Sequence, residues 1–132
     1  MIWLPDTDIA NYLLRRSQPS ASRYLEAMSA GDTLVLSPIV RYEVSRNLKL
    51  KGAVRLLREF ESMTENWKMI DFERPDWDTA ADLWAGRYSV GKGIDDADLL
   101  IVVCALKSGA TLVTNNTKHF EDLGLNLENW NQ

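Results

Sequence analysis

Short apolar runs alternate with longer helix-like segments along the whole chain, and this alternation limits the fold more than any other feature. Runs such as "DTLVLS" (32–37) and "ATLVT" (110–114) are rich in strand-forming residues. Between them, as in "PIVRYEVSRNLKLKG" (38–52), apolar residues recur at helical spacing. Strands that alternate with helices form a parallel sheet with helices on both of its faces. We therefore predict a three-layer α/β fold with a central parallel sheet of four or five strands.

Proline and glycine residues divide these segments into individual elements. We expect the first helix to have its N-cap at Thr7 or Asp8, and the apolar helix that follows the aspartates of "IDDAD" to run to Leu106 and to be closed by Gly109. The first helix is expected at 7–16, and the helices between these two at 19–31, 38–52, 53–63 and 75–91, with a short helix or turn at 115–124. The expected strands span 1–4, 32–37, 67–72, 110–114 and 125–130.

Length, charge and cysteine content indicate one cytoplasmic domain. The 132 residues fit a single domain covering 1–132. No apolar run approaches the roughly 18 residues of a membrane span, and no signal peptide opens the chain, so we expect no membrane contact. A net charge of −4 argues against a basic nucleic-acid coat but not against a nuclease, whose metal site is itself acidic. We expect the lone Cys104 to be buried and the lone His119 to lie at the surface on a short helix.

Three carboxylates stand where the functional crevice of an open α/β sheet is found, or on the apolar side of a helix. Asp6 follows the first strand directly. Glu43 adjoins an apolar helical stripe that includes Val40 and Val44, where a carboxylate is expensive to bury unless it is paired or bound to metal. Asp98 begins the buried face of the helix that one of the two preceding aspartates is expected to cap. Two of the three have a structural alternative, namely a cap for Asp6 and a salt bridge for Glu43.

Carboxylates that converge without a cation would repel each other strongly at neutral pH. Oxygen ligands with no histidine or cysteine favour Mg²⁺ or Mn²⁺ over zinc. A metal held by Asp6, Glu43 and Asp98 could activate a water and stabilise the leaving oxygen of a phosphodiester. We therefore predict a metal site for the hydrolysis of phosphate esters.

Four motifs resemble those of the PIN-domain ribonucleases, and in particular the VapC-like toxins of toxin–antitoxin pairs. They are "LPDT", "SPIVRYEV", "IDDADLLIVVCAL" and "GATLVTNNTKHF" followed by "GLNLENW", and they cover almost the whole chain in the family's order. The resemblance implies a PIN fold and a Mg²⁺- or Mn²⁺-dependent endoribonuclease that cuts tRNA or ribosomal RNA. It further implies inhibition of translation until a cognate antitoxin neutralises the protein, and a homodimer.

By position, Asp6, Glu43 and Asp98 match the acidic metal-site residues of that family. Asn116 falls at the fourth position, and Thr114 matches a threonine that supports the site. Thr7 matches the hydroxyl residue that often follows the first aspartate. Because Asn116 is neutral, we expect one tightly held metal and not two. Pro5 departs from the family pattern and removes a backbone donor next to Asp6, which leaves two alternatives: an unneeded donor or an altered geometry.

Two other functions are compatible with parts of the sequence. "LPDTDIA" contains the Asp-x-Asp step of haloacid-dehalogenase-type phosphatases, with Asp6 as nucleophile and Asp8 as acid, but Ala10 stands where that motif has threonine or valine. A PIN fold that no longer cleaves and binds RNA or protein is the other alternative. The presence of all three carboxylates counts against it.

The helical segments after Glu43 carry both basic and apolar residues. Arg46, Lys49 and Lys51 could contact RNA phosphates or form an ordinary solvated face. The leucines of this region outnumber one apolar stripe and suggest a surface for the antitoxin or a second copy. We expect four tryptophans to be core or packing residues and not stacking platforms: Trp67, Trp77, Trp84 and Trp130.

Overall fold

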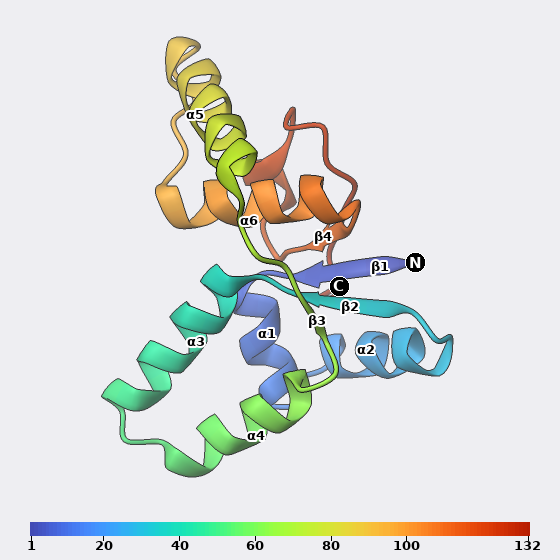
Figure 1. Ribbon diagram of the computed structural model, residues 1–132. Helices are drawn as coiled ribbons and strands as arrows, with labels where there is room; N and C mark the ends of the chain where they lie inside the picture. Colours follow the sequence, from blue (N-terminus) through green and yellow to red (C-terminus); the bar gives the residue numbers. More distant parts are fainter.

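A five-stranded parallel sheet runs through the middle of the protein, and the computed structural model describes it together with all of residues 1–132 (Figure 1). The strand order is β3-β2-β1-β4-β5, which places β1 at the centre. All four pairings are parallel. This confirms the predicted three-layer α/β fold. The strands are β1 (Ile2–Pro5), β2 (Thr33–Leu36), β3 (Lys68–Met69), β4 (Thr111–Val113) and β5 (Leu127–Glu128).

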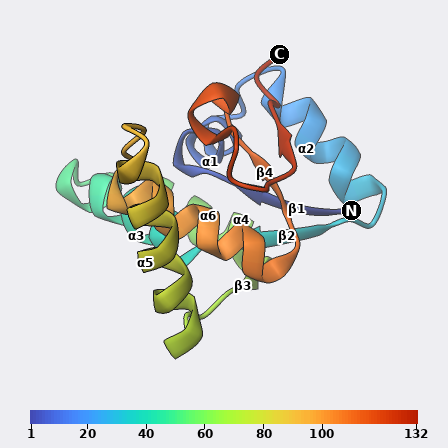
Figure 2. The same ribbon diagram turned by 90° about the horizontal axis from the view of Figure 1, so that it is seen from above.

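Helices cover both faces of the sheet (Figure 1). One side holds α1 (Thr7–Leu14), α2 (Ser20–Ser29), α3 (Pro38–Leu50) and α4 (Val54–Thr64), and the other holds α5 (Arg74–Ser89) and α6 (Asp96–Ser108). Seen from above, α6 lies over the sheet, and α5 crosses α6 near the amino-terminal end of α6 (Figure 2). A short 3₁₀ helix, η1 (Thr117–Phe120), joins β4 to the last strand.

The core is thickest where α6 packs on the central strands. Leu4 of β1 and Leu112 of β4 are inaccessible to solvent. In α6, every residue from Ile101 to Ala105 is buried, since the sheet covers one side of the helix and α5 part of the other. The predicted burial of Cys104 is confirmed, and burial raises the pKa of its thiol to about 11. Cys104 is therefore a core residue and not a nucleophile.

Pro5 occupies the last position of the central strand without disturbing its pairing. The Asp6 N–H donates to the Val113 carbonyl of β4 at 2.9 Å, which continues the ladder past the proline. Neighbouring residues of a parallel strand donate to opposite sides, so the N–H that Pro5 lacks would face β2. On that side the pairing of β1 ends with Trp3 and Leu34. The missing donor of Pro5 therefore falls beyond the paired residues of β2.

Local signals predicted most element boundaries, with two kinds of error. The cap of α1 is Asp6 and not Thr7 or Asp8. The strands expected at 67–72 and 125–130 shorten to two residues each, at the two edges of the sheet. An edge strand has a partner on one side only, so pairing stops where the single neighbour diverges. Asp95 caps α6, and Gly109 ends it in the left-handed conformation at φ 68°, as expected.

The four tryptophans predicted to be core or packing residues divide into a buried pair and a partly exposed pair. Trp67 and Trp130 are buried, and the Trp130 ring packs against that of Trp3 at 5.4 Å between centroids. Trp77 and Trp84, both on α5, remain 53% and 44% exposed. They lie outside the core because α5 packs mainly against α6 and buries a single residue of its own, Ala80. Both are packing residues, since Trp77 lies edge-on to Phe72 and Trp84 stacks on Tyr88.

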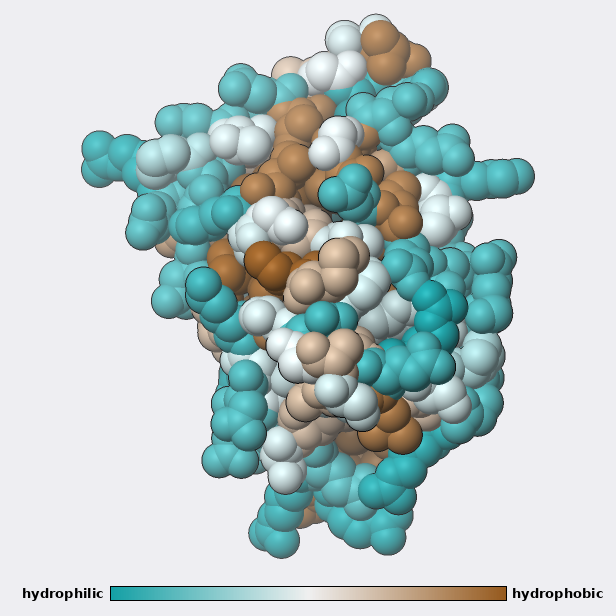
Figure 3. All heavy atoms as spheres, turned by 90° about the vertical axis from the view of Figure 1, so that its right-hand side faces the viewer, coloured by the Kyte–Doolittle hydropathy of each residue, from teal (hydrophilic) through white to brown (hydrophobic).

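The amino-terminal ends of the strands lie on the right in Figure 1, and the carboxyl ends on the left. The right-hand side is covered largely by hydrophilic side chains, with apolar ones gathered in its upper half (Figure 3). The predicted site residues lie at the opposite, carboxyl end. None of the helices has the length and apolar character that crossing a membrane requires.

Candidate active site

Asp6 lies at the carboxyl end of the central strand and is buried. Its carboxylate accepts a hydrogen bond from the Ile9 N–H at 2.9 Å and thereby caps α1. Burial raises the pKa of Asp6 from 3.8 to about 6; hydrogen bonds from Thr114 and Ile9 oppose the rise, and the charges of Asp8 and Asp98 add to it. No cation is among the groups that set this pKa. Capping therefore explains only part of the role of Asp6. A helix cap does not need a carboxylate that is buried and repelled by other carboxylates.

Glu43 reaches the neighbourhood of Asp6 from α3, which packs on α1. The Thr7 hydroxyl donates to Glu43 Oε1 at 2.7 Å. Arg46, one turn farther along α3, places Nη2 at 3.7 Å from Glu43 Oε2. Glu43 is thus neither isolated nor fully buried, with 21% of its side chain exposed. The Arg46 ion pair is the structural alternative for Glu43, and a loose, exposed pair of this kind contributes little to stability.

Asp98 stands in the first turn of α6, and its backbone N–H donates to the capping carboxylate of Asp95 at 2.9 Å. Burial raises the pKa of Asp98, and the charge of Asp95 raises it further. His119 opposes this effect with a contact of 3.0 Å between its Nε2 and Asp98 Oδ2. Two carboxylates of the predicted set, Asp6 and Asp98, are therefore held with elevated pKa values and close enough for their charges to interact.

Thr114 and Asn116 follow β4, the neighbour of β1 in the sheet. Thr114 is fully buried, and its hydroxyl hydrogen-bonds the Asp6 carboxylate. The backbone N–H of Asn116 donates to Thr114 Oγ1 at 3.1 Å, while the Asn116 side chain is exposed. Thr114 thus contacts the predicted site directly, whereas Asn116 contacts it through its backbone and through Thr114.

The six polar residues form two contacting groups at the carboxyl end of the sheet. One comprises Asp6, Thr114 and Asp98, with Asn116 joined to Thr114 through its backbone N–H. The other comprises Thr7 and Glu43, which adjoin Asp6 through the chain and through the packing of α1 on α3. No three His, Cys, Asp or Glu side chains lie close enough together to hold a metal ion by themselves. The metal role of Asp6, Glu43 and Asp98 therefore stays a prediction.

His119 is the site residue that the sequence did not reveal. Its short helix was predicted correctly, but its side chain faces Asp98 and is only 32% exposed. Arg87 of α5 holds the turn around it by donating to the backbone carbonyls of His119 and Glu121 at 3.4 and 3.1 Å. The available signal was its position in the loop after β4, the same loop that carries Asn116.

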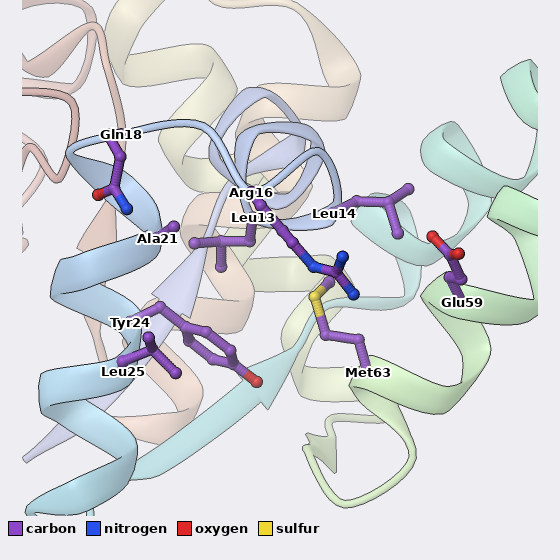
Figure 4. Close-up of a pocket in the computed structure, with 9 residues that line it drawn as sticks. All are labelled: Leu13, Leu14, Arg16, Gln18, Ala21, Tyr24, Leu25, Glu59 and Met63. Carbon is purple, nitrogen blue, oxygen red and sulfur yellow. The ribbon is translucent and has the colours of Figure 1, made fainter.

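An apolar pocket of about 370 Å³ lies elsewhere, between α1, α2 and α4. Figure 4 shows the side chains of Leu13, Tyr24 and Met63 pointing toward the space between these helices. The charged residues that line it are Arg16 and Glu59, and none of the predicted metal-site carboxylates does so. This pocket is suited to apolar contacts and not to phosphate chemistry.

The model of the PIN-domain family matches residues 3–125. The chain is a PIN-domain protein. The match includes every predicted site residue, from Asp6 to Asn116. Family membership, predicted from four motifs, is confirmed.

Individual relatives of this PIN domain agree with that placement. Ribonuclease VapC2 of Rickettsia felis is 34% identical over 137 residues and is matched over 100% of both chains. In the crystal structure of VapBC2 from Rickettsia felis bound to a DNA fragment from its promoter, a chain that is 29% identical superposes with a TM-score of 0.87 over 98% of this chain and 99% of that one. A chain of the VapBC-1 structure from nontypeable Haemophilus influenzae is 25% identical, with a TM-score of 0.83 and full coverage of both chains.

Proposed function

We propose that this PIN-domain protein is an endoribonuclease that depends on Mg²⁺ or Mn²⁺ and serves as the toxin of a type II toxin–antitoxin pair. The observation that carries the proposal is the buried Asp6, whose pKa of about 6 leaves it largely ionised at neutral pH beside Asp98. A buried carboxylate near a second one is destabilising unless a cation binds there. The kinship with Ribonuclease VapC2 supports RNA as the substrate.

The donor atoms fit a hard divalent cation. Asp6, Glu43 and Asp98 supply only carboxylate oxygens, which Mg²⁺ and Mn²⁺ prefer. A cation bound there would lower the pKa of a water and offset the charge that builds up on a phosphodiester. Because three protein ligands are not already gathered, we expect solvent or the RNA phosphate to complete the coordination. The neutral Asn116 fits one tightly held metal better than two.

The other polar residues would orient the carboxylates. Thr114 fixes the Asp6 carboxylate, and Thr7 fixes that of Glu43 by its hydrogen bond of 2.7 Å. His119 does the same for Asp98. Each of these contacts keeps a carboxylate oxygen in a defined direction, and a cation would have to displace the loose Arg46 ion pair from the second oxygen of Glu43. None of them requires the histidine to be a general acid or base.

The proposed partners follow from the same kinship. The Rickettsia felis and Haemophilus influenzae relatives were solved as VapBC assemblies, which supports a cognate antitoxin as the inhibitor of this protein. We propose that the uninhibited protein stops translation by cutting tRNA or ribosomal RNA. The apolar pocket between α1, α2 and α4 offers a surface for a partner protein (Figure 4). We also expect a homodimer; a monomer mass by light scattering would contradict this.

The test compares cleavage of total bacterial RNA by the unsubstituted protein, Asp98→Asn and Asp96→Asn, each with Mn²⁺ or EDTA. Asp96 is a matched control because it is exposed, lies in the same helical turn and loses the same charge. We expect discrete fragments that require Mn²⁺ and Asp98 but not Asp96. Fragments that persist in Asp98→Asn or in EDTA would show that cleavage depends on neither Asp98 nor a divalent metal, which would refute the proposal.

p-Nitrophenyl phosphate belongs in the same experiment, because it separates the phosphatase alternative. Turnover that survives Asp98→Asn but is lost in Asp6→Asn would support a phosphatase that uses Asp6 as nucleophile. RNA binding by a folded protein with no cleavage of either substrate would support the non-catalytic PIN module. PIN-family membership favours the nuclease over the phosphatase.

A further inference from the structure

A basic hollow lies on the outer face of α3, at the β3 edge of the sheet. It encloses about 410 Å³, and α3 lines it with one helical face that includes Arg41, Tyr42, Arg46 and Lys49. Pro38 and Ser45 lie on the same face, which is opposite the buried stripe of Val40, Val44 and Leu48. The sequence predicts either phosphate contact or an ordinary solvated face for Arg46, Lys49 and Lys51. Arg46 and Lys49 line the hollow together with Arg41 and Tyr42, whereas Lys51 lies outside it.

This hollow adjoins the candidate active site, because the side chain of Arg46 lines both. Arg46 also lines a second hollow of about 460 Å³ between α1 and α3, whose walls include Thr7, Asn11 and Glu43. The guanidinium of Arg46 lies 3.7 Å from the Glu43 carboxylate and 5.0 Å from the centre of the Tyr42 ring. A nucleic-acid strand laid along α3 would thus pass from the basic hollow over Arg46 to Glu43.

The charges in the hollow suit an anion. Three cationic side chains gather there against one carboxylate, Asp71, on a protein whose net charge is −4. Neither Arg41 nor Lys49 takes part in an ion pair, unlike Arg46, Arg55 and Lys107. The side chains of Arg41 and Lys49 are exposed, so packing does not explain their position in the hollow. Arg41 and Lys49 lie eight residues apart, roughly 12 Å along the helix, which is long enough to follow more than one nucleotide.

Tyr42 adds the second feature of a single-strand binding groove. Its ring is 59% exposed, although a large aromatic side chain is usually buried where packing allows. One face of the ring carries the Arg46 guanidinium. Positive side chains that track a backbone, together with an exposed aromatic ring on which a base can stack, are the pattern of proteins that bind single-stranded nucleic acid.

We propose that this hollow is a substrate subsite that holds single-stranded RNA next to the phosphodiester to be cut. Arg41 and Lys49 bind phosphates of that segment, Tyr42 stacks on a base, and Arg46 links the segment to the carboxylate site. The inference rests on the proposed ribonuclease function and adds to it the path of the substrate along α3.

The test measures RNA binding without cleavage. A fluorescein-labelled single-stranded RNA of mixed sequence is titrated in EDTA at several KCl concentrations, and its anisotropy is recorded. The test variant is Arg41→Ala/Lys49→Ala. The control is Arg55→Ala/Arg58→Ala, which removes two exposed cations from the adjacent α4, outside the hollow. All four side chains are exposed, and circular dichroism melting checks that both variants fold.

Loss of two phosphate contacts on a single strand should reduce the salt slope of log K by about 1.4 and weaken binding at 100 mM KCl on the order of 10-fold. The control should leave both quantities close to those of the unsubstituted protein. Equal losses in the two variants would point to a diffuse charge effect and overturn the subsite. Absence of RNA binding by the unsubstituted protein, or unchanged binding by the test variant, would overturn it as well.

Two further arms separate this inference from its neighbours. Asp98→Asn should lose cleavage in Mn²⁺ and keep RNA binding in EDTA, so a failure of the ribonuclease proposal is visible apart from a failure of the subsite. An acidic peptide, poly-glutamate, is titrated in parallel. If the test variant loses affinity for the peptide but not for RNA, the hollow serves an acidic protein partner and the proposal is wrong.

Discussion

Replacing Asp6 by asparagine should make the protein more stable at neutral pH while removing its proposed activity. Asparagine keeps the shape of the side chain, and its amide oxygen can still accept the Ile9 N–H that caps α1. What it removes is the buried negative charge. Raising the pKa of Asp6 from 3.8 to about 6 corresponds to roughly 3 kcal/mol of lost stability once the group is ionised, at about 1.4 kcal/mol per pH unit.

The pH dependence tests the cause. The folded state holds the Asp6 proton more tightly than the unfolded state, so the stability that protonated Asp6 gives is present below about pH 4 and is lost as the pH rises through about 6. The gain from Asp6→Asn should therefore be small at pH 4 and reach roughly 2–3 kcal/mol at pH 7.5. The stability difference therefore changes between about pH 4 and pH 6, because burial raises the pKa of Asp6. An ion pair would lower that pKa instead.

The assay is urea unfolding in EDTA, followed by tryptophan fluorescence at both pH values. Asp82→Asn is the matched control, since Asp82 is exposed on α5 and forms no ion pair, and we expect it to change stability by less than about 0.5 kcal/mol. No gain at pH 7.5, or a gain of the same size at pH 4, would refute the argument that the buried charge of Asp6 is costly. Addition of 10 mM Mn²⁺ should stabilise the unsubstituted protein and not Asp6→Asn, because only the former keeps all three proposed ligands.

Three other substitutions test separate parts of the structure. Thr7→Val removes the hydroxyl that donates to Glu43 at 2.7 Å; we expect a stability loss of about 1 kcal/mol and an RNA cleavage rate reduced roughly 10-fold, whereas an unchanged rate would mean that the contact does not orient Glu43. His119→Ala removes the 3.0 Å contact to Asp98. It should raise the Mn²⁺ concentration needed for half-maximal cleavage roughly 10-fold, as the loss of other residues that orient metal ligands does. An unchanged Mn²⁺ requirement would assign His119 a structural role. Leu112→Ala empties the fully buried centre of β4 and should cost about 2–5 kcal/mol in urea unfolding, with a much smaller cost showing that the core closes over the gap.

Properties that depend on neighbours along the chain were predictable. Alternating strand and helix patterns predicted the α/β class, and capping chemistry predicted an aspartate, Asp95 or Asp96, at the start of α6 and Gly109 at its end. The same reasoning placed Asp6 and Thr114 at strand ends, where functional groups gather in parallel sheets. These predictions succeed because capping, helical periodicity and backbone conformation act within a few residues.

Contacts between distant segments required the folded chain. The strand order places β1 beside β4, and only this brings Asp6 within reach of Thr114. The contact of His119 with Asp98, and the exposure of Trp77 and Trp84 on a helix covered on one side, follow from how α5, α6 and η1 pack. A local pattern states which side chains are apolar or charged, but which of them meet depends on the order of strands and the crossing of helices. The sequence therefore determined the elements and the chemistry they carry, and the tertiary structure decided which carboxylates share an environment and which cation stands beside them.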